Sequence, residues 1–268
     1  MTLKTVTIIG LGNWGKRVAS ILNLSEKYNT ETISSREILK NHLSINRPKN
    51  IVWITSPPPF QYEILELIQA KRVIVEKPFL SNRFEYEKWQ SKIQPNLFMS
   101  LPWNYSDIWL EIKNFLHSER EWKIEIQRKG PVRRSYLSPI ADWLPHDLGL
   151  ISDVSMNARI EILQGINLEN DFGSLKMNFN TDNIIEWHGG YSLEKLGVWK
   201  IENKQKSVLF DFMNRNSIMQ FREGKPKMRN YIDNPILTML TKIDDDDPNC
   251  KMNIQFDFYK KIFSTNMI

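Results

Sequence analysis

Residues 5–22 read TVTIIGLGNWGKRVASIL, and this stretch decides the fold of the first part of the chain. The apolar, β-branched run Thr5–Ile9 predicts a buried strand, and Lys16–Leu22 has apolar residues at helical spacing. Between the two stands the pattern G-x-G-x-x-G, formed by Gly10, Gly12 and Gly15. The order is therefore strand, glycine turn and helix.

Each glycine of this turn has a separate physical role in a phosphate-binding unit. Gly10 permits the tight turn, Gly12 lets a pyrophosphate approach the backbone, and Gly15 lets the helix pack closely on the strand. The free N–H groups at the helix N-terminus attract phosphate. We therefore interpret the turn, with Asn13 and Trp14 between its glycines, as dinucleotide-binding; the alternative is a turn with a purely structural role.

Strands and helices continue to alternate up to residue 102. Further strands are predicted near residues 30–34, 51–55, 73–75 and 97–100, and helices over 36–43, 60–70 and 82–93. This order requires right-handed crossovers between parallel strands. Residues 1–102 are thus predicted to form a doubly wound parallel sheet of the Rossmann type, in an α/β protein.

The pattern changes after residue 102. A helix over 107–117, a strand over 122–128 and a helical region over 139–154 are followed by strands in direct succession, predicted at 160–164, 174–179, 184–191, 198–202, 207–212 and 217–222. Successive strands with short gaps favour antiparallel pairing. Residues 103–268 are therefore predicted to form an α+β domain with a largely antiparallel open sheet.

The end of the second predicted strand bears on the choice of cofactor. An acidic residue usually binds the ribose of NAD there, but this sequence has Ser34, Ser35 and Arg36. These side chains could bind a 2′-phosphate, so NADP is the preferred cofactor and NAD is the alternative. Two other interpretations stay open: the serines could cap the next helix, and Glu31 could bind the ribose.

Two later strands end in residues suited to a ligand site. Thr55, Ser56 and Pro57 follow one apolar strand, and Glu76 and Lys77 follow the next. Open α/β sheets bind ligands at the carboxyl ends of their strands, so all five are candidate cofactor contacts. The alternative for Lys77 is a surface lysine in a loop.

At these two segments the sequence resembles a known family. Residues 51–57 and 71–79, the second containing Glu-Lys-Pro, are similar to the third strand and the Glu-Lys-Pro motif of the Gfo/Idh/MocA oxidoreductases. The resemblance implies that Lys77 lies beside the nicotinamide and the substrate oxygen, and that the Lys77–Pro78 peptide bond is cis. The family also carries an Asp and a His four positions apart, which here are Asp142 and His146, although Leu144 replaces the usual glycine.

Pro145 leaves the geometry of this second motif open. A helix capped by Ser138 and beginning at Pro139 would place Asp142 and His146 on one face. A helix that instead starts at Pro145 would separate them.

The resemblance implies an enzyme that transfers hydride between a nicotinamide and a carbonyl or hydroxyl carbon, or an imine, of a sugar, sugar nucleotide or related molecule. In this interpretation His146 moves the hydroxyl proton, Asp142 holds or hydrogen-bonds the substrate and orients His146, and Lys77 stabilises charge on the reacting oxygen. Candidate substrate contacts are Trp103, Arg133, Arg134 and Tyr136. The alternative function is a dinucleotide sensor that keeps the fold without turnover.

Composition sets further expectations. The net charge is +5, and the basic residues are scattered apart from Arg128, Lys129, Arg133 and Arg134, so we expect a small-molecule substrate that could be anionic and no nucleic acid as a partner. No apolar run reaches the roughly 18 residues that a membrane span needs, so no membrane partner is expected. The histidines and the single cysteine, Cys250, show no metal-ligand spacing, so no metal is expected. A lone cysteine also fits the cytoplasm.

We expect the protein to form a homodimer through the C-terminal sheet. The acidic run 244–247 is expected to be a solvated loop.

Overall fold

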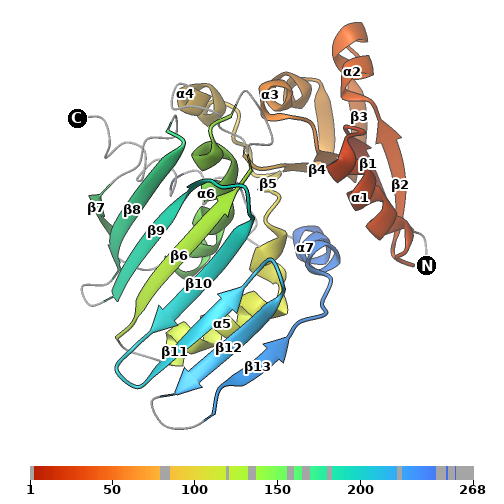
Figure 1. Cartoon of the computed structure of the whole chain (residues 1–268). Coiled ribbons are helices and arrows are strands. Elements are labelled where there is room, and N and C mark those ends of the chain that lie inside the picture. Colours follow the sequence, from red (N-terminus) through yellow and green to blue (C-terminus); the bar gives the residue numbers. More distant parts are fainter. Residues whose placement is uncertain are drawn as a thin grey trace. The chain divides into compact units, whose positions relative to one another are not determined.

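The computed structural model describes residues 3–78, 85–118, 121–131, 137–155, 160–164, 170–179, 183–221 and 225–245, with Met252 and Asp257. Internal contacts divide the chain into two compact units (Figure 1). The first comprises Met1–Pro102 with Ile236–Phe256, and the second comprises Trp103–Pro235 with Asp257–Ile268.

The described residues of the first unit form a five-stranded parallel sheet, here called sheet A, in the order β2-β1-β3-β4-β5. Its strands are β1 (Lys4–Ile9), β2 (Tyr28–Ile33), β3 (Ile45–Ile54), β4 (Ile68–Val75) and β5 (Leu97–Met99). Helices α1 (Asn13–Asn23), α2 (Ser35–Asn41), α3 (Pro58–Glu66) and α4 (Glu85–Gln90) connect them. Because the central strands are apolar, residues such as Ile8, Trp53 and Ile74 are fully buried. The doubly wound parallel sheet is confirmed.

Several predicted boundaries in this unit are wrong, most clearly around α3: β3 begins at Ile45 rather than at residue 51, and β4 begins at Ile68 rather than at residue 73. The helix expected over 60–70 ends at Glu66, and Ile68 already pairs with Ile45 in the adjacent strand. The backbone N–H of Ile45 donates to the carbonyl of Leu67 at 2.7 Å. Pairing with β3, which starts well before residue 51, thus overrides the helical spacing of the local apolar residues.

Helix α7 (Pro235–Asp244) returns the chain to the first unit, whereas the sequence analysis placed all of residues 103–268 in the second domain. Its buried face consists of Ile236, Met239, Leu240 and Ile243. The side chain of Asp244 is only 9% exposed and forms ion pairs with Lys4 and Arg72, the second at 3.6 Å. The acidic run therefore begins in a packed helix end, and the expectation of a wholly solvated loop is wrong for Asp244.

The described residues of the second unit form an eight-stranded sheet, here called sheet B, in the order β13-β12-β11-β10-β6-β9-β8-β7. Its strands are β6 (Lys123–Gly130), β7 (Ile160–Gln164), β8 (Phe172–Phe179), β9 (Asn183–Tyr191), β10 (Leu196–Glu202), β11 (Lys206–Asp211), β12 (Asn216–Phe221) and β13 (Lys227–Asn230). All pairs are antiparallel except β6 with β9. The largely antiparallel open sheet is confirmed, although β13 was not predicted.

Two helices cover one face of sheet B. Helix α6 (Pro139–Ser155) packs on β6, β8 and β9, and α5 (Asp107–Ser118), preceded by the short helix η1 (Pro102–Tyr105), places Trp109 against Trp199 of β10. In Figure 1 both α5 and α6 lie behind the sheet, so the viewer faces its open side.

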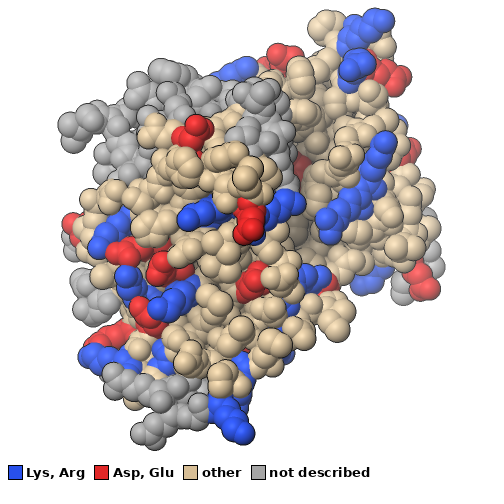
Figure 2. All heavy atoms as spheres, viewed as in Figure 1, with Lys and Arg blue, Asp and Glu red and all other residues tan. Residues whose placement is uncertain are grey.

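The open face of sheet B has a charged half and an apolar half. One row of register partners runs Lys176, Glu186, Glu125, Lys200, Leu209, Ile218 and Met228. Glu186 pairs with Lys123 at 2.7 Å and Lys176 at 2.8 Å, and these hydrogen bonds lower its pKa to about 2. Figure 2 shows charges of both signs intermingled over β8, β9, β6 and β10. Leu209, Ile218 and Met228 carry the row onto exposed apolar surface.

Candidate active site

The glycine turn between β1 and α1 has the geometry that its sequence predicts. Gly10 has a φ of +115°, and Thr55 Oγ1 donates to the carbonyls of Ile9 at 3.0 Å and Gly10 at 2.9 Å. A Cβ atom on Gly15 would lie 2.0 Å from the Gly10 carbonyl oxygen. Only glycine permits this left-handed backbone and this close approach of helix and strand.

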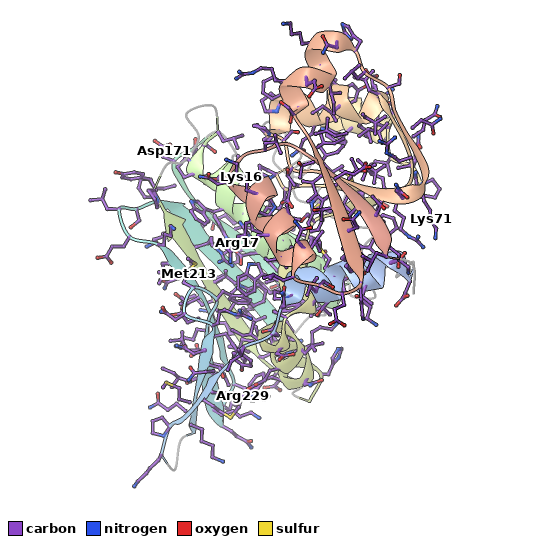
Figure 3. The ribbon with its side chains drawn as sticks, turned by 90° about the vertical axis from the view of Figure 1, so that its right-hand side faces the viewer. Lys16, Arg17, Lys71, Asp171, Met213 and Arg229 are labelled. Atoms are coloured by element: carbon purple, nitrogen blue, oxygen red, sulfur yellow. The ribbon has the colours of Figure 1, made fainter. Side chains whose placement is uncertain are left out.

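Gly12 lies on the open side of the turn. It is the N-cap residue of α1, makes no side-chain cap, and has no heavy atom within 4 Å of a built Cβ. Asn13 and Trp14 begin the helix there. Lys16 and Arg17 follow in the next turn of α1 (Figure 3), and the Arg17 guanidinium lies 5.8 Å from the centre of the Trp14 ring. The turn thus offers open space, uncapped N–H groups and nearby positive charge, which fit a pyrophosphate.

The end of β2 presents two hydroxyls and a guanidinium. The strand stops at Ile33, and Ser34 takes the N-cap position of α2 without a side-chain capping bond. Ser35 Oγ lies 2.6 Å from Ser56 Oγ, which links this position to the end of β3. Arg36 is exposed.

Glu31 lies two positions before the end of β2 and already has partners. Its carboxylate accepts from Thr7 Oγ1 at 3.2 Å and from Arg47 Nε at 3.3 Å. These contacts direct the carboxylate toward β1 and β3, and Glu31 lies opposite Thr7 in the strand register.

Gln61 joins the ends of β3 and β4. Its side-chain amide donates to the carbonyl of Ser56 at 3.0 Å and to that of Glu76 at 2.9 Å. Beside these residues, Thr55 is half-buried and Pro57 is exposed. The predicted contacts at the two strand ends are therefore neighbours at one edge of sheet A.

The side chain of Glu76 is directed into the interior of the first unit. Its carboxylate accepts from Trp53 Nε1 at 3.0 Å. Burial raises the pKa of Glu76, while Lys77 and the polar hydrogens of Ser100, Trp14 and Trp53 oppose this rise. The buried Glu76 carboxylate thus links the end of β4 to Trp53 of β3.

Lys77 follows directly at the carboxyl end of β4 and is half-buried. The Lys77–Pro78 peptide bond is cis, as the family resemblance implies. The lysine thus stands at the edge where parallel α/β sheets bind their ligands.

Helix α6 settles the question that Pro145 left open. It is continuous from Pro139 to Ser155, and Ser138 caps it by accepting the N–H of Ala141 at 3.1 Å. Asp142 and His146 therefore share one face, a single turn apart. Asp142 is buried and His146 half-buried. The His146 ring stacks on Trp143, with ring centres 6.1 Å apart.

Of the four predicted substrate contacts, the structure describes Trp103. Trp103 is half-buried and meets the Phe212 ring edge-on, with centres 5.3 Å apart. Arg133, Arg134 and Tyr136 lie outside the described residues.

Sequence analysis did not single out Asp147, the residue after His146. Asp147 is fully buried and bonded to Arg128. The sequence does carry a signal for this pair, because Arg128 continues the inward-facing series of Ile124 and Ile126 in β6. A charged residue at an inward strand position needs a buried partner.

Solved structures share this fold over nearly the whole chain. UDP-N-acetylglucosamine 3-dehydrogenase GnnA from Acidithiobacillus ferrooxidans is 14% identical, with 98% of this chain and 97% of that chain covered and a TM-score of 0.69. The dehydrogenase MviM from Clostridium difficile is 17% identical, with 98% and 99% covered and a TM-score of 0.68. KijD10, a 3-ketoreductase from Actinomadura kijaniata, was solved as a lysine variant in complex with TDP-benzene and NADP; it is 8% identical, with 98% and 96% covered and a TM-score of 0.73.

The chain shares its fold with these dehydrogenases and this ketoreductase, in agreement with its resemblance to the Gfo/Idh/MocA oxidoreductases. No protein-family model and no curated protein matches the sequence. At these identities the likeness establishes the fold, and the chemistry must be argued from the residues of the site.

Two further observations concern the described part of the chain. None of its helices is long and apolar enough to span a membrane. Its His, Cys, Asp and Glu side chains form no group of three placed to bind a metal ion.

Proposed function

We propose that the protein is an NADP-dependent oxidoreductase that acts on a carbonyl or hydroxyl carbon, or an imine, of a sugar or sugar nucleotide. The observation that carries the proposal is the continuity of α6. Ser138 caps the first turn of this helix, and the continuous helix places Asp142 and His146 on one face. A protein that only senses a dinucleotide needs the glycine turn but not this acid and histidine pair.

The first unit fits the dinucleotide. The open space at Gly12 leaves room for the pyrophosphate, and the proposal assigns the 2′-phosphate to Ser34, Ser35 and Arg36. Glu31 supports this assignment because its carboxylate is already engaged by Thr7 and Arg47. When bound, the cofactor would supply or accept the hydride.

The chain's own residues would then handle the proton and the charge. His146 takes the hydroxyl proton during oxidation and returns it during reduction, since histidine can do both near neutral pH. Asp142, one turn away on α6, orients the imidazole or hydrogen-bonds the substrate. Lys77 stabilises negative charge on the reacting oxygen.

The structural neighbours favour a sugar nucleotide as the substrate class. One is a dehydrogenase of a UDP-linked sugar, and another is a ketoreductase solved with a TDP-linked ligand and NADP. A nucleotide-linked sugar also brings the anionic group that the basic composition leads us to expect.

A cofactor and substrate screen tests the proposal. Consumption or formation of reduced nicotinamide is followed by absorbance with UDP- and TDP-sugars and both cofactors. We expect turnover with NADP(H), and we expect Lys77→Ala and His146→Asn each to lower kcat by about 10²- to 10⁴-fold while cofactor affinity is retained. Tight NADP binding without turnover on any sugar nucleotide would instead identify the protein as a sensor.

We also propose that the protein is a cytoplasmic homodimer that pairs through the open face of sheet B. Exposed Leu209, Ile218 and Met228 form an apolar strip next to the charged half of that face, and such a strip is suited to burial against a second copy. Sedimentation of Leu209→Lys/Ile218→Lys should show a monomer where the parent protein shows a dimer. A monomeric parent protein would refute the dimer.

A further inference from the structure

A buried polar cluster next to His146 fastens α6 to sheet B. Asp147 is fully buried and accepts hydrogen bonds from Arg128 Nε at 2.9 Å, from a second Arg128 nitrogen, and from the indole N–H groups of Trp187 and Trp199, both at 2.9 Å. These donors lie on β6, β9 and β10. We call Asp147, Arg128, Trp187 and Trp199 the Asp147 clamp.

The clamp restricts rotation of α6 about its own axis. Trp143, one turn before Asp147, packs against β6 so closely that a Cβ atom on Gly130 would lie 2.3 Å from its ring. Trp143 and Asp147 therefore face sheet B together. Successive helical residues are about 100° apart, so Asp142 and His146 project from the neighbouring side of the helix. A rotation that redirects His146 would break the hydrogen bonds of Asp147.

Pro145 removes one hydrogen bond from α6 close to the clamp. It lies within α6 and has no N–H to donate to the carbonyl of Ala141. The hydrogen-bond ladder of the helix is thus interrupted in the turn that carries Asp142 and His146. Asp147 lies two residues after Pro145, and its hydrogen bonds connect this turn to sheet B.

Sheet B leaves space for the ion pair of Arg128 and Asp147. A Cβ atom on Gly197 of β10 would lie 2.4 Å from Arg128 Nη1, so glycine leaves room for the guanidinium. Buried ion pairs contribute little net stability compared with apolar residues of similar volume. In some proteins such a pair instead selects a single orientation of the element that carries it.

We propose that Asp147 is a positioning residue, which through its hydrogen bonds to three strands sets the direction of Asp142 and His146. The inference rests on the proposed function, in which these two side chains act on the substrate. It adds a residue that touches neither substrate nor cofactor.

The test replaces the ion pair by apolar residues, in the double variant Arg128→Met/Asp147→Leu. The matched control is Lys113→Met/Asp153→Leu, because Asp153 lies further along the same helix and accepts from Lys113 at 3.2 Å and from Trp109 at 2.6 Å. Both variants remove one ion pair and one carboxylate that accepts from tryptophan. Three quantities are compared: NADP affinity by calorimetry, kcat with the sugar nucleotide from the screen, and the rate at which diethyl pyrocarbonate modifies His146, resolved by mass spectrometry.

We expect the clamp variant to bind NADP as the parent does and to lose about 10²-fold in kcat, which is the cost of moving a catalytic group by roughly 1 Å. The modification rate of His146 should change several-fold, with His42 and His117 as unchanged internal references. The control variant should match the parent in both readouts.

An unchanged kcat and an unchanged modification rate of His146 in the folded clamp variant would overturn the proposal. If the double variant does not fold, Arg128→Lys replaces it, since lysine keeps the charge but loses the two-point contact; the same outcomes then decide. If the parent protein binds NADP but turns over no sugar nucleotide, the proposed function fails. The modification rate of His146 still decides whether Asp147 positions it.

Discussion

At the scale of single residues, cofactor choice depends on the side chain that meets the adenosine ribose. Arg36 is exposed directly after Ser34 and Ser35, and Glu31 is bonded to Thr7 and Arg47. We expect Arg36→Ala to weaken NADP binding and to leave NAD binding nearly unchanged, because only NADP carries the phosphate that the guanidinium would pair with. A lost charged hydrogen bond costs about 1.5–3 kcal/mol, or roughly 10- to 100-fold in affinity.

Calorimetry with both cofactors measures this effect, and Lys40→Ala, further along α2, is a control for general loss of positive charge. Equal loss of NADP affinity in both variants would point to a general field effect. A parent protein that prefers NAD would refute the assignment of the 2′-phosphate site.

Glu76 gives a second prediction at this scale, concerning the pH dependence of stability. Burial raises its pKa above the ordinary value of 4.5, so between these two values the folded state keeps a proton that the unfolded chain has lost. The free energy of unfolding therefore falls as the pH rises through this window. Glu76→Gln keeps an oxygen that can accept from Trp53 but cannot ionise. We expect this variant to lose that fall and to be more stable than the parent above the window.

Urea denaturation at a series of pH values measures the effect. Glu63→Gln serves as the control, because Glu63 is exposed on the adjacent helix α3. Parallel stability curves for the parent and Glu76→Gln would contradict the prediction.

At the scale of elements, the cap of α6 can be tested directly. Ser138 Oγ accepts the N–H of Ala141, which would otherwise have no partner in the first turn. We expect Ser138→Ala to lower the free energy of unfolding by about 1 kcal/mol, and Ser138→Thr to retain most of it because threonine also caps helices. Thermal unfolding of the three proteins measures both effects. Equal losses in both variants would show that the hydroxyl is not what stabilises the turn.

Elements were predictable where their signal is local. β1, α1 and α6 each combine an apolar pattern with a boundary signal nearby: the glycine turn ends β1 and begins α1, and Ser138 with Pro139 begins α6. The boundary between α3 and β4 was not predictable, because it depends on pairing of Ile68 with Ile45. Helix α7 was not assigned, although Ile236, Met239, Leu240 and Ile243 recur at helical spacing.

The candidate site follows the same division between local and distant signals. The glycine turn and Lys77 of the first unit, and the Asp142 and His146 pair of the second unit, belong to short motifs that one sequence can show. The Asp147 clamp joins α6 to residues on three strands, up to 52 positions away in sequence. Alternation marks Arg128 as inward-facing, but only the fold shows which carboxylate meets it.

At the scale of the whole molecule, ion pairs between residues far apart in the chain join parts of the first unit. Asp244 at the end of α7 pairs with Arg72 of β4 and with Lys4 of β1, 240 positions away. The Arg72 side chain is 10% exposed, so it depends on this carboxylate for its neutralisation. The stability of sheet A should therefore depend on a helix that follows the whole second unit in sequence.

Asp244→Asn tests this dependence, since asparagine keeps the size of the side chain and removes its charge. We expect the free energy of unfolding to fall by about 1–3 kcal/mol, because Arg72 loses the one carboxylate that the described part of the chain places within ion-pair distance of it. Asp245→Asn is the matched control: it makes the same change of charge at the next position, where the side chain is exposed. Urea denaturation of both variants separates the loss of the buried ion pair from the change in net charge. A similar small decrease in the free energy of unfolding in both variants would contradict the prediction and would show that only the apolar face of α7 holds this helix in place.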